Sequence, residues 1–184
     1  MRIGFLGVCC FCLVGCSDLD DLGYEEPEKY NIAELTFIAR EDNGESFLSY
    51  VDPDLEGPLN PITNTVQLKN NSDYTIRLNF AYDFILDEEE RIEGNETILS
   101  QSKDYQVFLI LENENGSFVS NLEAIDTDDN QNTLGLEWEI STAITGFVDM
   151  RVVLVYDPIK PNLNLNSAEG FIVFDATVNF IIQG

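Results

Sequence analysis

The sequence predicts an all-β fold, an immunoglobulin-like antiparallel β-sandwich of about 8–9 strands. From Ile32 onward, apolar and polar residues alternate at every second position, and clusters of Asn, Asp and Gly separate the alternating segments. No window shows the period of an amphipathic helix. The 184 residues suffice to bury one hydrophobic core without disulfides or metals, so a single β-domain is expected over residues 32–184.

The clearest predicted strand covers residues 74–84. Ile76 and Leu78 lie on one of its faces and Arg77 on the other, so one face is expected in the core and the other in water. Shorter segments with the same alternation are residues 34–40, 47–51, 65–69, 105–111, 118–124, 134–140, 147–156 and 171–182.

Several segments between these strands are predicted to be turns. Asn, Asp and Gly in residues 42–44, 70–73 and 113–116 tolerate the positive φ that tight hairpins require. Residues 87–93 are expected to form either a short helical turn or an acidic loop.

Residues 1–15 have the features of a lipoprotein signal peptide. Arg2 supplies a positive charge, and the apolar residues 3–14 are too few for a permanent membrane-spanning helix of about 20 residues. The stretch ends in Leu13-Val14-Gly15-Cys16, which resembles the bacterial lipobox, where cleavage precedes an acylated cysteine. We therefore expect lipidation at Cys16, with the membrane as a partner through that anchor.

Residues 16–31 are predicted to be the lipidated Cys16 and a flexible acidic tether, because charged residues crowd this segment and no apolar period lets it pack. Residues 17–21 resemble the acidic export signal of surface lipoproteins in the Bacteroidota, although an ordinary acidic linker is nearly as good an interpretation. The expected location is the outer membrane, at its surface-exposed or its periplasmic face.

The composition excludes several partners and reactions. Lys plus Arg number 9 against 34 Asp plus Glu, a net charge of -25, so nucleic acid is not expected as a partner. The chain has no histidine, which removes Ser-His-Asp and Cys-His nucleophiles. All four cysteines lie within the signal segment and at its end, so no thiol chemistry is expected in the folded body. We expect no enzyme and no catalytic residues.

A candidate calcium site lies in the second half of the chain. Asp126, Asp128, Asn130 and Asn132 place oxygens at alternate positions, and Glu137 completes the ligand spacing of an EF-hand loop. The position that needs Gly in an EF-hand holds Gln here, and strands flank the loop. Two interpretations remain, a calcium site in a β-loop and a plain solvated loop.

Asp52, Asp54 and Glu56 form an alternative cation site in a short segment that contains one proline and precedes another. The competing interpretation is a rigid acidic turn, in which Gly57 adopts a conformation that other residues avoid. No cofactor other than calcium is expected.

Trp138, the only tryptophan, shares one face of its segment with Leu136 and Ile140. We predict a core residue rather than a sugar-stacking platform. An exposed aromatic row formed with Tyr82 and Phe84 would instead favour carbohydrate binding.

Motifs along the mature chain resemble those of uncharacterised outer-membrane lipoproteins of the Bacteroidota. They are Thr36-Phe37, the Asp-x-Asp-x-x-Gly loop at residues 52–57, residues 71–80, Tyr105-Gln106-Val107-Phe108, Asp126-Thr127-Asp128 and Gly135-Leu136. A histidine of that family is replaced by Tyr105, so any role of the histidine is absent here. The resemblance implies a lipid-anchored β-sandwich and no established activity.

Two functions are expected from these observations. The first is a membrane-anchored, non-catalytic β-sandwich module, structural or ligand-binding, with calcium as a candidate stabilising ion. The alternative is a carbohydrate-binding or carbohydrate-active accessory protein of an outer-membrane uptake system. Either function leaves a protein or a glycan as the partner.

Overall fold

The computed structural model describes residues 27–55, 57–83, 91–112 and 118–184. The predicted signal peptide, the lipidation site Cys16 and most of the predicted tether lie outside the described residues. Within the described ranges, no helix is long and apolar enough to cross a membrane.

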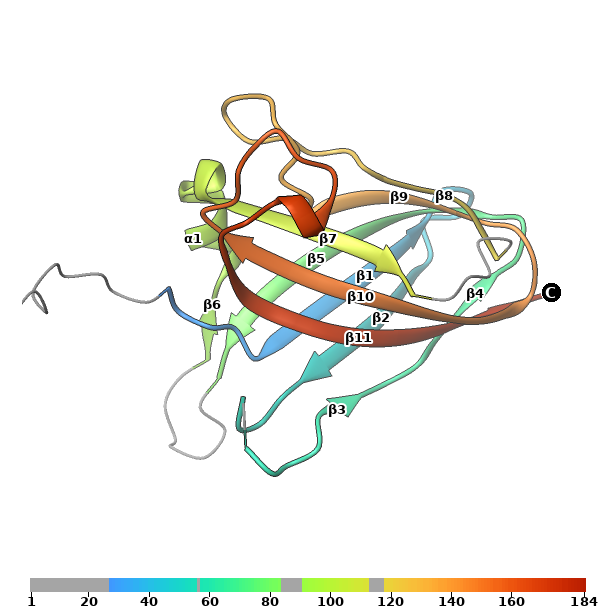
Figure 1. The fold of residues 1–184 in the computed structure, drawn as a ribbon. Coiled ribbons are helices and arrows are strands. Elements are labelled where there is room, and N and C mark those ends of the chain that lie inside the picture. Colours follow the sequence, from blue (N-terminus) through green and yellow to red (C-terminus); the bar gives the residue numbers. More distant parts are fainter. Residues whose placement is uncertain (1–26, 56, 84–90, 113–117) are drawn as a thin grey trace, which may run out of the picture.

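The described residues form eleven strands and three short helices (Figure 1). In chain order they are β1 (Ile32–Ala39), β2 (Glu45–Val51), β3 (Ile62–Thr63), β4 (Val66–Lys69), β5 (Asp73–Tyr82), β6 (Ile92–Glu93), α1 (Asn95–Ser100), η1 (Ser102–Asp104), β7 (Tyr105–Leu111), β8 (Val119–Ala124), β9 (Glu137–Thr142), β10 (Gly146–Tyr156), η2 (Leu165–Ser167) and β11 (Phe171–Gln183).

The strands form two sheets that pack into a sandwich, which confirms the predicted all-β class. The larger sheet has the order β3-β2-β1-β5-β9-β8, with β6 also paired to β5, and the smaller sheet has the order β4-β11-β10-β7. Taken in chain order as strands A to G, β1, β5, β7, β8, β9, β10 and β11 reproduce the ABED and CFG sheets of an immunoglobulin domain. The sequence-predicted architecture therefore holds at the level of strand order.

Three details differ from the prediction. Strand β4 runs parallel to β11, so the sandwich is not purely antiparallel. The strands β3 and β6 have two residues each, too few for alternation to reveal them. Helix α1 begins two residues after the segment 87–93, in which a short helical turn was one of two expectations, and residues 87–90 lie outside the described residues.

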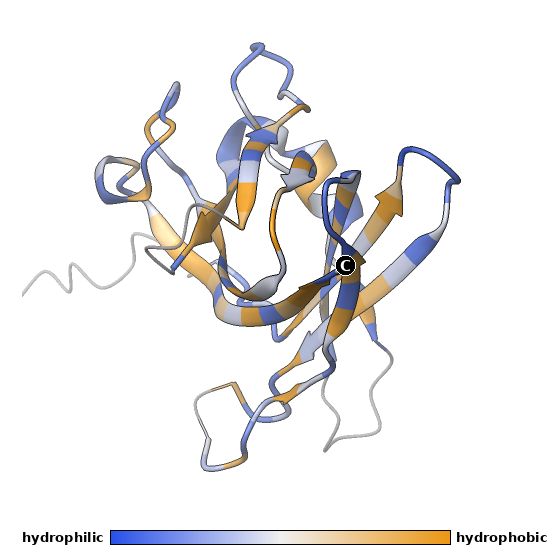
Figure 2. Cartoon of the chain, turned by 90° about the vertical axis from the view of Figure 1, so that its right-hand side faces the viewer, coloured by the Kyte–Doolittle hydropathy of each residue, from blue (hydrophilic) through white to orange (hydrophobic). Residues whose placement is uncertain are grey.

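The core lies between the two sheets. Every second residue of β5 from Tyr74 to Phe80 is buried, as the alternation predicts. Across the interface, the rings of Phe37 in β1 and Phe180 in β11 have centroids 5.6 Å apart. Figure 2 shows the resulting alternation of hydrophobic and hydrophilic bands along the strands.

The central strand β10 is buried on both of its faces. Val152 and Leu154 belong to the core between the sheets, whereas Val153 and Val155 belong to a second cluster that includes Ala168. Ala168 lies in the connection between β10 and β11, residues 157–170, which we call the covering segment. The covering segment therefore packs on the outer face of the smaller sheet.

The folded body begins before the predicted boundary at residue 32. Tyr30 and Asn31 are buried, and the Tyr30 N–H donates to the Val173 carbonyl at 2.9 Å. The Asn31 side chain donates to the Asp83 carbonyl at 2.8 Å and accepts from the Asp83 N–H at 3.0 Å. The last two residues of the predicted tether are thus part of the sandwich, because their contacts come from β11 and from the residue that follows β5, and such distant contacts leave no local sequence signal.

Candidate functional site

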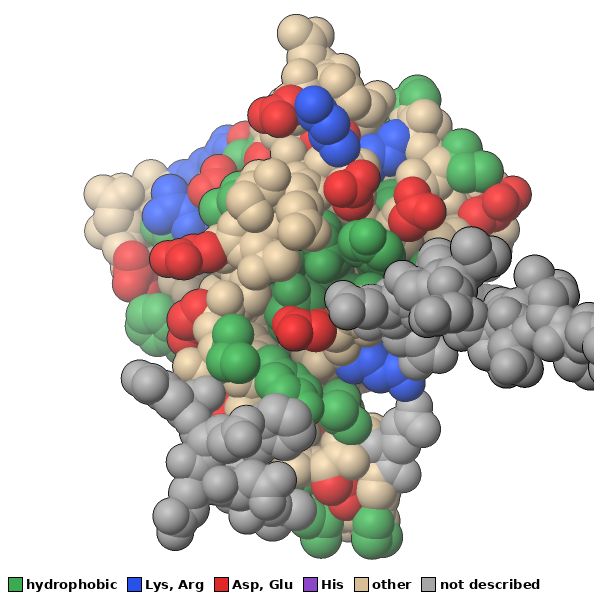
Figure 3. Space-filling view, turned by 90° about the vertical axis from the view of Figure 1, so that its left-hand side faces the viewer, with side chains coloured by type: hydrophobic (Ala, Val, Ile, Leu, Met, Phe, Trp, Pro, Cys, Tyr) green, Lys and Arg blue, Asp and Glu red, His purple; other side chains and the backbone are tan. Residues whose placement is uncertain are grey.

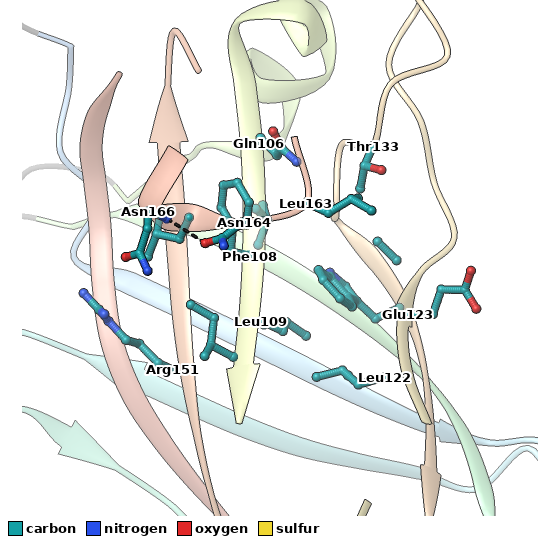
Figure 4. A pocket seen from close by; sticks show the side chains of 15 residues that line it. Gln106, Phe108, Leu109, Leu122, Glu123, Thr133, Arg151, Leu163, Asn164 and Asn166 are labelled. Atoms are coloured by element: carbon teal, nitrogen blue, oxygen red, sulfur yellow. Dashed lines mark hydrogen bonds between the residues drawn. The ribbon is translucent and has the colours of Figure 1, made fainter. Parts of the chain in front are cut away.

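A cavity of about 830 Å³ opens between β7 and β8, and we call it the β7–β8 groove. Each of these strands is the last strand of its sheet, so the groove lies at the open side of the sandwich. Figure 4 shows side chains from both strands and from the covering segment around this opening. The groove is lined by residues 106–110, 122–124 and 163–166, together with Thr133, Trp138 and Arg151.

The inner wall of the groove is apolar. Leu109 of β7, Leu122 of β8 and Trp138 of β9 line it, and all three pack against the main core. The indole N–H of Trp138 donates to the Gly135 carbonyl at 2.6 Å, which fixes the ring in the wall. Trp138 thus packs against the core, as predicted, and is also part of a cavity wall, which the sequence did not indicate.

Of the two aromatic residues that would form an exposed row with Trp138, the structure describes only Tyr82, and Tyr82 does not line the groove. Tyr82 is half-buried and is not among the groove residues. Phe84 lies outside the described residues. Among the described residues, the aromatic side chains at the groove are therefore Trp138 and Phe108.

Gln106 contributes a buried polar group to the groove lining. Its side chain is among the most buried in the protein, with 1% of the residue exposed. The side-chain amide donates to the Asn162 carbonyl at 2.5 Å, whereas Oε1 is buried and has no hydrogen-bond partner among the described residues. A buried acceptor without a donor costs about 1–3 kcal/mol, so a ligand N–H or O–H that reached Oε1 would remove an existing penalty.

A buried ion pair holds the covering segment in place. Lys160 Nζ lies 3.0 Å from Asp128 Oδ2 and donates to the Ser102 carbonyl at 2.8 Å. The two charged side chains are 6% and 0% exposed. Burial alone would raise the pKa of Asp128, but hydrogen bonds from Asn132, Lys160 and Asn130 outweigh burial and lower that pKa. Asp128 is therefore held as a carboxylate that balances the lysine.

The predicted calcium ligands go to different partners in this structure. Asp128 faces Lys160, and its Oδ1 accepts the backbone N–H groups of Asn130 and Asn132 at 2.8 and 2.9 Å. Glu137 pairs with Arg77 of β5 at 3.0 Å. No group of three acidic or cysteine side chains suited to a metal ion occurs within the described ranges. An ammonium group thus lies where the sequence suggested a metal ion, and calcium binding stays a prediction.

Asp126, the first predicted ligand, serves the backbone of the same loop. Its two carboxylate oxygens accept the N–H groups of Gly135 and Leu136 at 2.8 and 2.9 Å. Burial raises the pKa of Asp126 despite these hydrogen bonds. The bonds fix the segment 133–136, in which Thr133 lines the groove and the Leu134 carbonyl accepts the Val107 N–H at 2.7 Å.

The alternative cation site has the geometry of a turn. Asp52 Oδ1 accepts the Asp54 N–H at 3.3 Å, and Asp54 Oδ2 accepts the Leu59 N–H at 3.0 Å. Asp54 Oδ1 is buried and has no hydrogen-bond partner among the described residues. Glu56, the third predicted ligand, lies outside the described residues, so the structure brings together only two of the three.

The charges around the groove are mostly acidic or neutralised. Arg151 is held by Asp175 through two hydrogen bonds of 2.7 and 2.6 Å, which leaves the exposed Glu123 as the carboxylate among the lining residues. Figure 3 shows acidic side chains scattered over one end of the molecule, with fewer basic ones between them. The net charge of -25 and Glu123 in the lining favour cationic ligands at the groove.

Comparison with protein-family models, with curated proteins and with solved structures gives no match to this chain. The resemblance to lipoproteins of the Bacteroidota therefore stays a prediction from the sequence motifs.

Proposed function

We propose that this chain is a lipid-anchored, non-catalytic β-sandwich module that binds a ligand in the β7–β8 groove. Ligand binding is supported by the groove itself, which combines an apolar wall with the Oε1 of Gln106, a buried acceptor that has no hydrogen-bond partner among the described residues. The anchoring clause is supported by the lipobox ending at Cys16 and by the acidic segment that follows it.

The lining supports binding rather than catalysis. Glu123 is the single carboxylate among the described lining residues, so the paired acids of glycoside hydrolysis are lacking there. The chain has no histidine that would activate a serine or a water molecule. The lining also presents the amides of Gln106, Asn164 and Asn166, which are polar groups of the kind that orient a ligand.

Trp138 offers a direct test of the binding clause. It is the only tryptophan and lies in the groove wall, so its fluorescence reports on this site. We expect saturable changes in its emission on titration with at least one member of a panel of oligosaccharides and short peptides. The absence of any change, together with no heat of binding by calorimetry, would contradict binding in the groove.

A blocking variant with a matched control separates groove binding from nonspecific effects. Leu163 lines the groove and is 86% exposed, whereas Ile159 is in the same covering segment, is 55% exposed and does not line the groove. Both are surface residues, so Leu163→Arg and Ile159→Arg are expected to leave stability within about 0.5 kcal/mol. Only Leu163→Arg is expected to weaken binding.

The anchoring clause has a separate test. The wild-type protein is expected in the detergent-rich phase after phase partitioning, and a variant that begins at Ser17, without the signal segment and Cys16, in the aqueous phase. Wild-type protein that stays in the aqueous phase would contradict lipid anchoring and would leave the groove proposal untouched.

Carbohydrate binding is the second candidate function, favoured by the position of Trp138 in a wall that also presents amide side chains. Oligosaccharides are therefore one half of the fluorescence panel, and the emission change they cause would identify this function.

A further inference from the structure

Strand β7 is a sheet edge that carries no protective residue of its own. The four end strands of the two sheets are β3, β8, β4 and β7. Strand β3 has only two residues, and β4 has four residues and ends in Lys69. Strand β8 carries Glu123 and a register shift. These are features that keep edges from pairing with other chains. The seven residues of β7, by contrast, include no charged residue and no proline.

The free edge of β7 presents backbone groups to the groove. The Glu112 N–H, one residue beyond the strand, donates to Asp149 on the β10 side, whereas the Val107 N–H donates to Leu134 on the opposite side. In an antiparallel ladder the direction of these groups alternates, so Leu109 and Leu111 also face away from β10. No backbone hydrogen bond from the described residues reaches their N–H groups on that side.

We infer that the β7 edge binds an extended peptide, which pairs with Leu109 and Leu111 as an additional strand of the smaller sheet. This inference rests on the proposed function and names its ligand class. Side chains of an added strand would alternate between the two faces of the sheet. An apolar side chain on the inner face meets Leu122 and Trp138, and a side chain on the outer face meets the covering segment near Asn164.

The charge of the protein selects among peptides. The chain has a net charge of -25, Glu123 stands at the groove, and Arg151 is already paired with Asp175. Opposite charge accelerates association and suppresses wrong partners. The expected ligand is therefore a segment that alternates apolar and basic residues.

The test uses the full-length protein in a neutral detergent and a short peptide of alternating lysine and valine. Binding is expected to change Trp138 emission and to slow hydrogen exchange at the Leu109 and Leu111 amides at least about tenfold. The amides of Phe108 and Ile110 already face β10 and are the internal controls, since their exchange is expected to change less. A peptide of alternating glutamate and valine is the charge control and is expected to bind more weakly.

Two N-methylated peptides test the backbone pairing without changing the protein. One carries methyl groups on the valine amides and the other on the lysine amides. Because only one edge of the added strand faces β7, one of the two is expected to lose about fivefold in affinity for each hydrogen bond removed, and the other to lose less. Equal binding of both methylated peptides and the parent peptide would overturn strand pairing.

The remaining outcomes separate this inference from the proposed function. Oligosaccharides that change Trp138 emission while no peptide does so would overturn the peptide ligand and leave groove binding intact. Protection of Leu109 and Leu111 in the protein alone, with dimer formation, would show that a second copy occupies the edge and would also overturn it. Failure of every peptide and oligosaccharide to change Trp138 emission would overturn both.

Discussion

Replacing Lys160 with methionine tests whether an ammonium group holds the covering segment over the groove. Lys160 Nζ lies 3.0 Å from Asp128 Oδ2, with both side chains almost fully buried, so solvent screening is small. Removing one partner of a buried pair costs about 3–5 kcal/mol, because the other charge stays buried. Asp128 keeps the N–H groups of Asn130 and Asn132, so we expect a loss of about 3 kcal/mol in the free energy of unfolding.

Denaturant unfolding of Lys160→Met, Asp128→Asn and the double variant measures this coupling. The loss corresponds to a fall of about 6–12 °C in the melting temperature of a domain of this size. The double variant is expected to recover part of the loss, since it leaves no unpaired buried charge. Lys103→Met is the matched control, because Lys103 and Asp129 form a 3.8 Å pair that is 53% and 76% exposed.

The pH dependence of the free energy of unfolding tests the same ion pair independently. The lowered pKa of Asp128 in the folded state means that this residue stabilises the protein above its ordinary pKa, and that the contribution is lost as the pH falls below that value. Asp128→Asn is therefore expected to unfold with a shallower dependence on pH in the acid range. The reasoning is refuted if Lys160→Met is no less stable than Lys103→Met, or if Asp128→Asn keeps the acid dependence of the wild type.

Three further predictions concern the loop, the metal and the edge. Gly135→Ala is expected to lower the free energy of unfolding by about 2–4 kcal/mol, because φ is +87° at this residue and a Cβ would lie 2.4 Å from the Val107 carbonyl oxygen. Gly44→Ala is the control, because a Cβ there would meet only a side chain. Equal melting temperatures for the two variants would contradict this prediction. Melting curves in calcium and in chelator are expected to coincide, because Lys160 already neutralises Asp128, and a higher melting temperature in calcium would instead support the calcium site predicted from the sequence. At about 1 M salt the Debye length is about 3 Å, so repulsion between copies is screened. Sedimentation is then expected to detect self-association that is absent at low salt. A monomer at both salt concentrations would show that charge does not protect the β7 edge.

Strands could be predicted from the sequence because burial on one face leaves a two-residue alternation. Residues 105–111 and 171–182 match β7 and β11 to within one residue. The predicted strand 134–140 shows the limit of this signal, since β9 begins only at Glu137. Leu134 accepts a hydrogen bond from Val107 of one sheet and Leu136 accepts one from Leu78 of the other. Alternation reports only which side chains are buried. Leu134 and Leu136 are buried, but they lie in a connection between the two sheets rather than in a strand.

The groove could not be predicted in the same way, because its polar groups depend on contacts between distant segments. Gln106 bonds to Asn162, 56 residues away, and Lys160 bonds to Asp128, 32 residues away. A single glutamine in an apolar strand and a single lysine in a loop carry no local pattern. The alternating oxygens of residues 126–132 are a genuine pattern, but they serve the loop backbone and a lysine. The free edge of β7 appears only once the strand order is known.

The net charge of the protein offers a reason why the edge of β7 can stay open without aggregation. An apolar strand edge with free backbone groups invites pairing between copies, and proteins usually prevent this with a charge or proline on the strand itself. In β7 a charge or proline at residues 106–110 would also stand in the groove, where it would exclude a ligand. A net charge of -25 spread over the rest of the molecule repels other copies without occupying the edge, and the same field attracts a basic peptide. Global charge can thus perform the protective role that local charges perform on β4 and β8, and it leaves β7 open to a partner of opposite charge.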